Sequence, residues 1–406
     1  MSSLRRLALV VVVPALAVGA FAPASFADAP VGSSAAGTGI VADAGYAAWR
    51  ADDGHVVLRT AGGEQVPTKL TPPKSAILDV GADPEWDAQL VWAESCSLRK
   101  RTCIVRSASL SPAGVEQVRG IARIPYRGGG SPAVAIDGKR LAYAVHGTTG
   151  SGKRKSACDV PYVLTVSPRG RSPRKLDRGH CAAISQLDVG DGSVAILAHP
   201  AVQYGTGATE ARVVKAGGGH SRTLQREAQG EESNYLGAVS LDRGSLYTAR
   251  GGIRQANAFT RIVLASGRRT DARAFVNLEG SFARDGGRDY YAQTVGYETS
   301  TDCPCLVVAG DDPFSAAQRT LAPELSLSAA PQPVYVDSAP SAVATLSRRT
   351  VSKTAVVGTA PVAGVPVELL STNVAGGPVN QQPPAPTGVV ATTGADGTAT
   401  LPVPGT

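Results

Sequence analysis

A short, mostly apolar segment that ends in alanine recurs six times along this chain, and no other feature of the sequence restricts the fold as strongly. The six copies occupy residues 45–48, 90–93, 141–144, 195–198, 246–249 and 289–292. Their final alanines follow one another at similar intervals along the chain. That regular spacing fits a unit of four short antiparallel strands, and the apolar residues lack the helical period of about 3.6. The repeat therefore predicts an all-β chain whose main part is a six-bladed β-propeller.

The composition agrees with this architecture. The chain of 406 residues has 46 Gly and 28 Pro but only 18% charged side chains, which predicts frequent turns and argues against coiled coils and helix-rich bundles. One four-stranded sheet cannot bury both of its faces alone, whereas radial stacking covers each sheet with its neighbours. Residues 333–337 then either pair with the first blade to close the ring or form a plain linker. The alternation of strands alone also fits β-sandwich domains.

The third repeat carries a more specific pattern. In the stretch 133–144, the turn residues Asp137 and Gly138 lead into an apolar run. This stretch resembles the repeats of TolB-like (WD40-like) propellers, in which a turn of the Pro-Asp-Gly type precedes an apolar strand. The fifth repeat, 241–246, and the second, which keeps Asp87, resemble the pattern less closely. The resemblance covers about residues 40–325, and it implies a propeller fold without implying a particular site.

The first part of the chain, 1–27, has the pattern of a secretory signal. Arg5 and Arg6 precede an apolar run over 7–22, and small residues lead up to Ala27. The run is interrupted by Pro14 and is shorter than the roughly 20 residues that span a bilayer, although a retained membrane anchor is the alternative. We expect cleavage after Ala27, which removes the two arginines and changes the formal net charge from +7 to +5. No second apolar stretch of that length follows, so we expect a secreted or cell-envelope protein without a transmembrane segment.

The rest of the chain divides by composition. We expect a linker over 28–39, the propeller over 40–330, a second linker over 331–340 and a separate module over 341–406. The stretch 341–406 contains no aromatic residue and no Cys, and it is rich in Val, Thr, Gly and Pro. Within it, the runs 356–359, 364–370 and 389–401 resemble bacterial immunoglobulin-like domains of exported proteins.

The resemblance implies a small β-sandwich, with two further expectations. Asp396 and Gly397 lie between two alternating runs, which predicts a β-hairpin at that point. The module is short for the family and lacks the usual last strand. Its sheet is therefore either incomplete or filled at the edge by something else.

Six cysteines lie in the exported part of the chain, and an even number in that compartment favours disulfides over metal sites. They are Cys96, Cys103, Cys158, Cys181, Cys303 and Cys305. A bond between Cys96 and Cys103 would link the two strands of a hairpin, and a closed loop of about 8 residues gives roughly 2.5 kcal/mol of stabilisation. The remaining cysteines would then pair within 158/181 and 303/305, although sequence alone permits fifteen pairings. Zinc is the alternative, but no CxxC pair accompanies these residues.

Patterns that would indicate catalysis or a cofactor are weak. Residues 147–153 match a phosphate-binding loop until Arg154, which replaces the Ser or Thr that would hold magnesium. The five His residues occur singly at strand ends or in loops, which favours structural or surface roles. Residues 52–54 and 310–312 lack the alternating ligands of a calcium loop. We therefore assign no catalytic, cofactor-binding or metal-binding residue and expect no cofactor.

Several aspartates lie beside or near glycines, where turn formation explains them. They are Asp137, Asp188, Asp191, Asp242 and Asp285. Carboxylates from several blades can nevertheless converge on the central channel of a propeller even when they are distant in sequence. Two or more carboxylates facing each other within about 5 to 9.5 Å would support a glycosidase, whereas a channel lined by Val, Ala and Ser would remove that hypothesis.

Basic residues cluster in the second and third repeats. The candidate members of a basic patch are Arg99, Lys100, Arg101, Lys153, Arg154, Lys155, Arg171, Arg174 and Lys175. If these loops share one face, they would attract an anionic cell-envelope polymer or an acidic protein; otherwise they are simply solvent-exposed loops. The net charge is small for this length and no aromatic residues are interleaved, so we expect no binding of nucleic acid.

These features predict an exported, non-catalytic binding or scaffold protein. It would recognise a cell-envelope or extracellular ligand through the propeller loops or the channel mouth. The alternative function is an extracellular polysaccharide hydrolase or lyase with carboxylates in the channel.

Overall fold

The computed structural model describes most of the chain. The described residues are 28–34, 39–128, 131–146, 161–168, 173–200, 208–228, 235–251, 257–276, 278–293, 305–310, 312–315, 318–329, 341–371 and 385–402. Strands and turns account for their regular structure. No helix in these ranges is long and apolar enough to cross a membrane.

The described strands up to residue 310 form six antiparallel sheets of four strands each. Sheet 1 contains β2 (Val41–Asp43), β3 (Tyr46–Arg50), β4 (Val56–Thr60) and β5 (Gln65–Val66). Sheet 2 contains β6 (Leu78–Ala82), β7 (Ala88–Ser97), β8 (Thr102–Ser111) and β9 (Gly114–Pro125). Sheet 3 contains β10 (Val134–Asp137), β11 (Arg140–His146), β12 (Pro161–Pro168) and the first half of β13 (Arg174–Gly190).

The remaining three sheets follow the same order. Sheet 4 contains the second half of β13 with β14 (Ser193–Pro200), β15 (Ala208–Lys215) and β16 (Arg222–Ala228). Sheet 5 contains β17 (Tyr235–Asp242), β18 (Ser245–Gly251), β19 (Ala258–Val263) and β20 (Arg269–Arg273). Sheet 6 contains β21 (Leu278–Asp285), β22 (Arg288–Gln293), β23 (Cys305–Gly310) and the N-terminal strand β1 (Ala29–Ser34).

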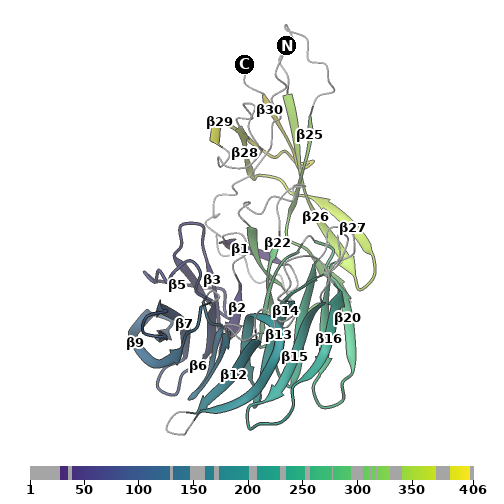
Figure 1. The fold of residues 1–406 in the computed structure, drawn as a ribbon. Coiled ribbons are helices and arrows are strands. Elements are labelled where there is room, and N and C mark those ends of the chain that lie inside the picture. Colours follow the sequence, from purple (N-terminus) through teal and green to yellow (C-terminus); the bar gives the residue numbers. More distant parts are fainter. Residues whose placement is uncertain are drawn as a thin grey trace, which may run out of the picture.

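The six sheets close into a ring. The first strand of each sheet contacts the first strand of the next, in the order β2, β6, β10, the second half of β13, β17 and β21, and β21 returns to β2. The sheets stand side by side around this ring (Figure 1). The all-β fold class and the propeller architecture predicted from the repeat are therefore confirmed.

The recurring alanine lies in the second strand of every sheet. Each copy is at most 2% exposed, and the six are Ala48, Ala93, Ala144, Ala198, Ala249 and Ala292. Instead of one central core, six apolar clusters fill the spaces between successive sheets, including the space between sheet 6 and sheet 1. Small side chains suit these positions because each sheet is covered on both faces.

The ring is closed by the N-terminal strand. Strand β1 pairs with β23, so the first strand of the described chain completes the last sheet. The indole Nε1 of Trp49 donates to the carbonyl of Ser33 at 3.0 Å and ties this strand to sheet 1. The prediction of a linker over 28–39 is therefore wrong for Ala29–Ser34, which form a strand because β23 would otherwise present an unpaired edge. Residues 333–337, the other candidate for closure, lie outside the described residues.

The C-terminal strands form a second unit in two layers. One layer contains β25 (Glu324–Ala329), β26 (Ser341–Ser352), β27 (Val356–Pro361) and β30 (Thr398–Pro402). The other is the pair β28 (Pro366–Ser371) and β29 (Ala385–Thr392). Val367, Leu369 and Leu401 are buried between the layers. This unit extends away from the ring of sheets (Figure 1). Strand β25 belongs to it, so the unit begins before the boundary predicted at residue 341.

The hairpin predicted at Asp396 and Gly397 is wrong in its pairing. A tight turn does occur there, with the Gly397 amide donating to the Gly394 carbonyl at 2.9 Å. However, β29 pairs with β28, whereas β30 pairs with β26. The turn therefore carries the chain from one layer to the other.

The junction of the two units adds one short strand. Strand β24 (Gln318–Thr320) pairs with the far end of β26. Arg349 of β26 accepts a hydrogen bond at its carbonyl from the Leu321 amide at 2.8 Å, and its Nη2 donates to the Phe275 carbonyl at 2.7 Å. The C-terminal unit is thus bonded to the propeller beside sheets 5 and 6.

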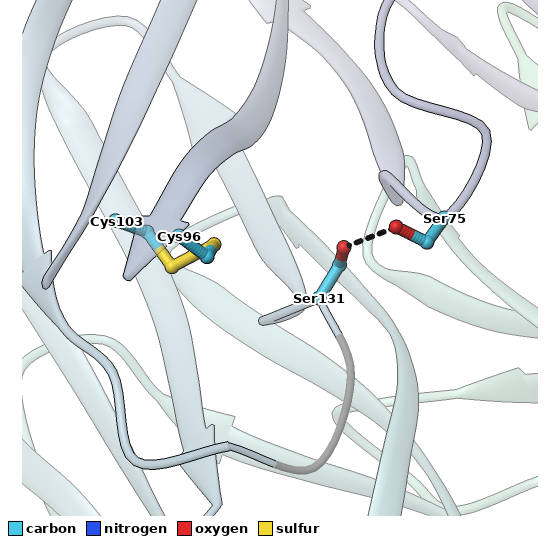
Figure 2. The surroundings of a disulfide bond; sticks show 4 residues. All are labelled: Ser75, Cys96, Cys103 and Ser131. Carbon is cyan, nitrogen blue, oxygen red and sulfur yellow. Dashed lines mark hydrogen bonds between the residues drawn. A yellow bond between two sulfur atoms is a disulfide. The ribbon is translucent and has the colours of Figure 1, made fainter. Parts of the chain in front are cut away.

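The disulfide predicted between Cys96 and Cys103 is present and links β7 to β8, with a Cα to Cα distance of 4.0 Å (Figure 2). Nearby, the hydroxyls of Ser75 and Ser131 lie 3.0 Å apart and join the segments that precede sheets 2 and 3. Cys305 is buried in β23. The other three predicted cysteines have side chains outside the described residues: Cys158, Cys181 and Cys303.

Sheets 2 and 3 approach each other at backbone distance. A Cβ atom on Gly81 would lie 1.8 Å from the Ile136 carbonyl oxygen, so only glycine fits there. The Gly138 amide donates to the Ala82 carbonyl at 2.9 Å, and the side-chain amide of Gln89 donates to the carbonyls of both of these residues.

Replacement of Gly81 by alanine tests this close approach. We expect Gly81→Ala to lower the free energy of unfolding by more than about 2 kcal/mol, because the backbone of Ile136 must move away. Gly217→Ala is the matched control, since a Cβ there meets nothing within 4 Å. Urea unfolding of the two variants and the wild type measures the difference, and equal free energies would contradict the close packing of these sheets.

Candidate functional site

Five aspartates gather where the innermost strands end. Asp43, Asp137 and Asp285 are the last residues of β2, β10 and β21, each directly before the turn to the second strand. Asp79 and Asp188 lie further back within β6 and β13. Because these strands surround the axis of the ring, the five carboxyl groups come from five different sheets and converge on one region. We call them the axial carboxylate cluster.

Three members bridge neighbouring sheets. Asp79 accepts a hydrogen bond from the Ile136 amide at 2.7 Å, and Asp188 accepts one from the Leu241 amide at 2.5 Å. Asp285 accepts one from the Gly45 amide at 2.6 Å. The bonds cross from sheet 2 to 3, from 4 to 5 and from 6 to 1. Innermost strands have one edge without a strand partner, so Asp79 and Asp188 satisfy strand amides that would otherwise be buried without an acceptor, whereas Asp285 bonds the amide of a turn.

The cluster holds protons more tightly than free carboxyl groups do. Burial, then the charges of Asp188, Asp285 and Asp137, raise the pKa of Asp43 to about 8 against the opposing effect of the Ala44 amide. Burial raises the pKa of Asp188 to about 7 although backbone amides oppose it. Burial is the largest cause in both cases, and the neighbouring carboxyl groups act in the same direction because the innermost strands bring them together around the axis.

The other members differ in depth. Asp79 is 3% exposed, and burial followed by the charges of Asp188 and Asp43 raises its pKa well above 3.8. Asp137 and Asp285 are only half-buried, and burial is the largest cause of their raised pKa values. The cluster therefore has a deep part, used as hydrogen-bond acceptors, and a part that solvent reaches at the turns.

Basic side chains of the same turns brace this end of the ring. Arg243 Nη2 donates to the Gly286 carbonyl at 3.1 Å, across sheets 5 and 6. Arg288 donates to the Ala61 carbonyl, across sheets 6 and 1. These guanidinium groups bond backbone carbonyls and so hold neighbouring turns together.

A shallow groove lies beside the cluster between sheets 2 and 3. Its lining includes Ile136, Leu141, Arg119 and Lys139. Arg119 is 3.9 Å from the carboxylate of Glu85, which is a long and largely solvated ion pair. The groove therefore offers the cationic side chains of Arg119 and Lys139 between sheets 2 and 3.

The basic residues predicted from the sequence do not gather on one face where the structure describes them. Arg99, Lys100 and Arg101 form the turn between the second and third strands of sheet 2. Arg174 and Lys175 begin the fourth strand of sheet 3. In an antiparallel sheet the start of the fourth strand lies at the opposite end from the turn between the second and third strands. Arg174 Nη1 donates to the Gly217 carbonyl. The other candidates lie outside the described residues: Lys153, Arg154, Lys155 and Arg171.

The aspartates explained as turn residues have a second role. Asp191 bonds the Gly244 amide at 2.6 Å from its turn, and Asp188 is a strand residue rather than a turn residue. Sequence reasoning did not single out Asp43 or Asp79. The signal that could have found Asp79 is the shared pattern Leu-Asp-Val-Gly at residues 78–81 and 187–190.

Other candidate chemistry is limited in the described ranges. No group of three or more His, Cys, Asp or Glu side chains there is arranged to hold a metal ion. His55 pairs with Asp53 at 3.1 Å on the surface, and burial lowers the pKa of His199. Residues 147–154, which partly match a phosphate-binding loop, lie outside the described part of the chain.

Comparisons with known proteins assign this chain neither a family nor an activity. No protein-family model and no curated protein sequence matches the chain. Among solved structures, a nidogen/laminin complex aligns at 15% identity and TM-score 0.39, over 65% of this chain and 88% of that one. A puromycin-hydrolysing peptidase of Mycobacterium tuberculosis aligns at 14% identity and TM-score 0.38, over 66% of this chain.

A third structure, an oligogalacturonate lyase in complex with manganese, aligns at 9% identity and TM-score 0.39, over 62% of this chain and 68% of that one. The chain spans only 41% of the length of the Mycobacterium peptidase. At these values the likeness assigns no activity, and the class of the protein, a β-propeller, rests on its own closed ring of sheets.

The raised pKa of Asp43 predicts a pH-dependent stability. Its carboxyl group binds a proton more tightly in the folded chain, with a pKa of about 8, than in the unfolded chain, with a pKa of 3.8. Its contribution to stability is therefore complete below about pH 4 and is lost as the pH rises through 8. We expect the melting temperature to be lower at pH 8.5 than at pH 5.5, and Asp43→Asn to reduce this difference.

Asn at position 43 keeps an oxygen for the Ala44 amide, which now bonds Asp43 Oδ1 at 2.7 Å. The control is Glu64→Gln, an exposed carboxyl group of the same sheet. Melting curves between pH 5 and pH 9 give the comparison. An Asp43→Asn variant with the pH profile of the wild type would show that Asp43 ionises normally.

Proposed function

We propose that this chain is an exported, six-bladed propeller with a C-terminal immunoglobulin-like module, and that it binds a ligand rather than transforming one. Residues 1–27 have the pattern of a secretory signal, and the Cys96–Cys103 disulfide is compatible with an oxidising compartment. Six four-stranded units and a two-layer C-terminal unit support the two parts of this description. The stretch 133–144 carries the resemblance to TolB-like propellers.

The axial carboxylate cluster supports a ligand with a positively charged group, such as an ammonium or a guanidinium. Its members lie on the innermost strands of five sheets, which is the observation that carries the proposal, and their raised pKa values agree with it. An incoming cation stabilises the ionised carboxylates and displaces their protons. The half-buried Asp43 and Asp137 make the first contact, whereas Asp79, Asp188 and Asp285 stay bonded to neighbouring sheets.

The source of the cation that fits best is a protein partner. Lysine and arginine side chains carry their charge at the end of a long stem, which suits contact with the half-buried carboxyl groups at the turns. Anionic envelope polymers fit less well at this end, because each carboxyl group at the axis repels an anion once it ionises.

A second function is favoured by one feature of the cluster. Adjacent carboxyl groups with separated pKa values can serve as acid and base in glycoside cleavage. With a pKa of about 8, Asp43 would be the acid, and a carboxyl group of lower pKa would be the base. The channel mouth is not lined by Val, Ala and Ser alone, so the hydrolase or lyase alternative stands.

Binding of a tri-lysine peptide tests the first function. We expect calorimetry to show binding with proton release, and tighter binding at pH 8 than at pH 6, because fewer protons must then be displaced. Asp43→Asn and Asp137→Asn should each weaken binding about tenfold, as for the loss of one charge pair worth about 1.4 kcal/mol. Glu64→Gln should bind as the wild type does.

A tri-glutamate peptide is the ligand control. Equal binding of both peptides, or tri-lysine binding that does not change with pH, would contradict recognition at the cluster. Incubation with polygalacturonate and with xylan tests catalysis in parallel. Release of new sugar ends by the wild type, with none from Asp43→Asn, would replace the binding role by a catalytic one.

A further inference from the structure

Asp28, the residue that follows the expected cleavage point, is fully buried at the seam of the ring. Its carboxylate accepts a hydrogen bond from the hydroxyl of Tyr291 at 2.7 Å and lies 3.5 Å from Nε of Arg319. Its backbone nitrogen donates to the Thr320 carbonyl at 2.7 Å. Asp28, which directly precedes β1, is therefore bonded to β22 through Tyr291 and to the short strand β24 through Arg319 and Thr320.

The neighbouring strand leaves room for this side chain. A Cβ atom on Gly310 would lie 2.6 Å from Asp28 Oδ1, so the carboxylate occupies the space that a side chain would need. Gly310 is in turn the cross-strand partner of Asp289 on β22. Asp28 and Asp289 therefore lie on the same face of sheet 6, on either side of a glycine.

The charges around this point do not balance. Arg284 pairs with Asp242 at 3.3 Å, with Asp289 at 2.5 Å and with Asp312 at 3.0 Å. Arg319 is the second guanidinium of the group. Four carboxylates, with Asp28 the fourth, thus face two buried guanidinium groups, and the exposed Arg243 lies 3.8 Å from Asp242.

Asp289 shows where positive charge is missing. It is 1% exposed, and in the part of the chain that the structure describes its Oδ2 has no hydrogen-bond partner. A buried carboxylate oxygen without a donor is costly, so a further cation near this seam would be stabilising.

We propose that hydrolysis of the peptide bond between Ala27 and Asp28 supplies that cation, and that the new N-terminal ammonium of Asp28 locks the closed ring. Hydrolysis adds one water, leaves a carboxylate on Ala27 and frees an amine on Asp28, which takes up a proton at neutral pH. A signal peptidase of the export route is the class of enzyme that would catalyse it. The inference rests on the export part of the proposed function.

The bonds of Asp28 already suit an ammonium group. The backbone N–H of Asp28 donates to the Thr320 carbonyl. An ammonium group at the same nitrogen would keep and strengthen that hydrogen bond, and it would have two further N–H donors. In the precursor the same nitrogen is an uncharged amide. Closure by β1 is thus weaker before export and becomes complete once the leader is removed.

Two forms of the chain test the proposal. One begins at Asp28 and the other carries Gly-Ser before Asp28, each released from a fusion by a protease that leaves the stated first residue. We expect the chain that begins at Asp28 to melt at a higher temperature. We also expect its α-amine to be acetylated at least about tenfold more slowly in the folded protein than in urea, since the amine is held in a closed site.

Three controls separate charge from length. Gly-Ser added after Thr406 should leave the melting temperature unchanged. Asp289→Asn, made in both forms, should reduce the difference in melting temperature between them, because it removes a carboxylate that the ammonium stabilises. Mass spectrometry of protein exported with its own leader should give Asp28 as the first residue.

The outcomes that would overturn the proposal are equally specific. They are a different first residue, equal melting temperatures for the two forms, or an α-amine that reacts as fast in the folded protein as in urea. If Asp289→Asn does not fold, the acetylation rate of the wild type still decides the question. None of these measurements uses a ligand, so failure of tri-lysine binding would leave the result intact.

Discussion

The structure depends on how the innermost strands satisfy the backbone amides that face the axis. A strand at the centre of the ring has a strand partner on one side only. Asp79, Asp188 and Asp285 provide acceptors across three of the six interfaces between sheets. The same bonds bring charged groups together, so the cluster that holds the sheets also forms the most polarised region of the molecule. Structural and ligand-binding roles are therefore combined in the same side chains.

The sequence predicts repeated and local features well, and it predicts poorly which strands pair when they are far apart in the chain. Ala48 and Ala292 mark equivalent buried positions because every sheet needs a small residue there, and such a need recurs in the sequence. The Cys96–Cys103 bond was predictable because its partners flank one local hairpin. By contrast, Ala29–Ser34 is rich in small and turn-forming residues and has the composition of a linker. It becomes a strand only because β23, at the far end of the propeller sequence, lacks a partner.

The candidate site shows the same division. Asp137 and Asp285 were recognised as aspartates near glycine, but their convergence depends on the order of the sheets around the axis. Asp43 gave no local signal that separates an inward-facing carboxyl group from a turn residue, and the only signal for Asp79 was the Leu-Asp-Val-Gly pattern that residues 78–81 share with 187–190. The turn at Asp396 and Gly397 was correctly located, whereas its flanking strands pair with different layers. Local chemistry is thus readable from the sequence, and the choice of partner strand is not.

The attachment of the C-terminal unit has a mechanical consequence. Strand β26 runs from that unit to β24, and Thr320 of β24 bonds the first residue of the closing segment. If the C-terminal unit were tethered to a surface while the propeller held a ligand, the pulling force would pass along β26 to the closing seam through β24 and to the end of sheet 5 through Arg349. Bond strength at these two attachments would then set the tension at which the propeller opens and releases what it holds.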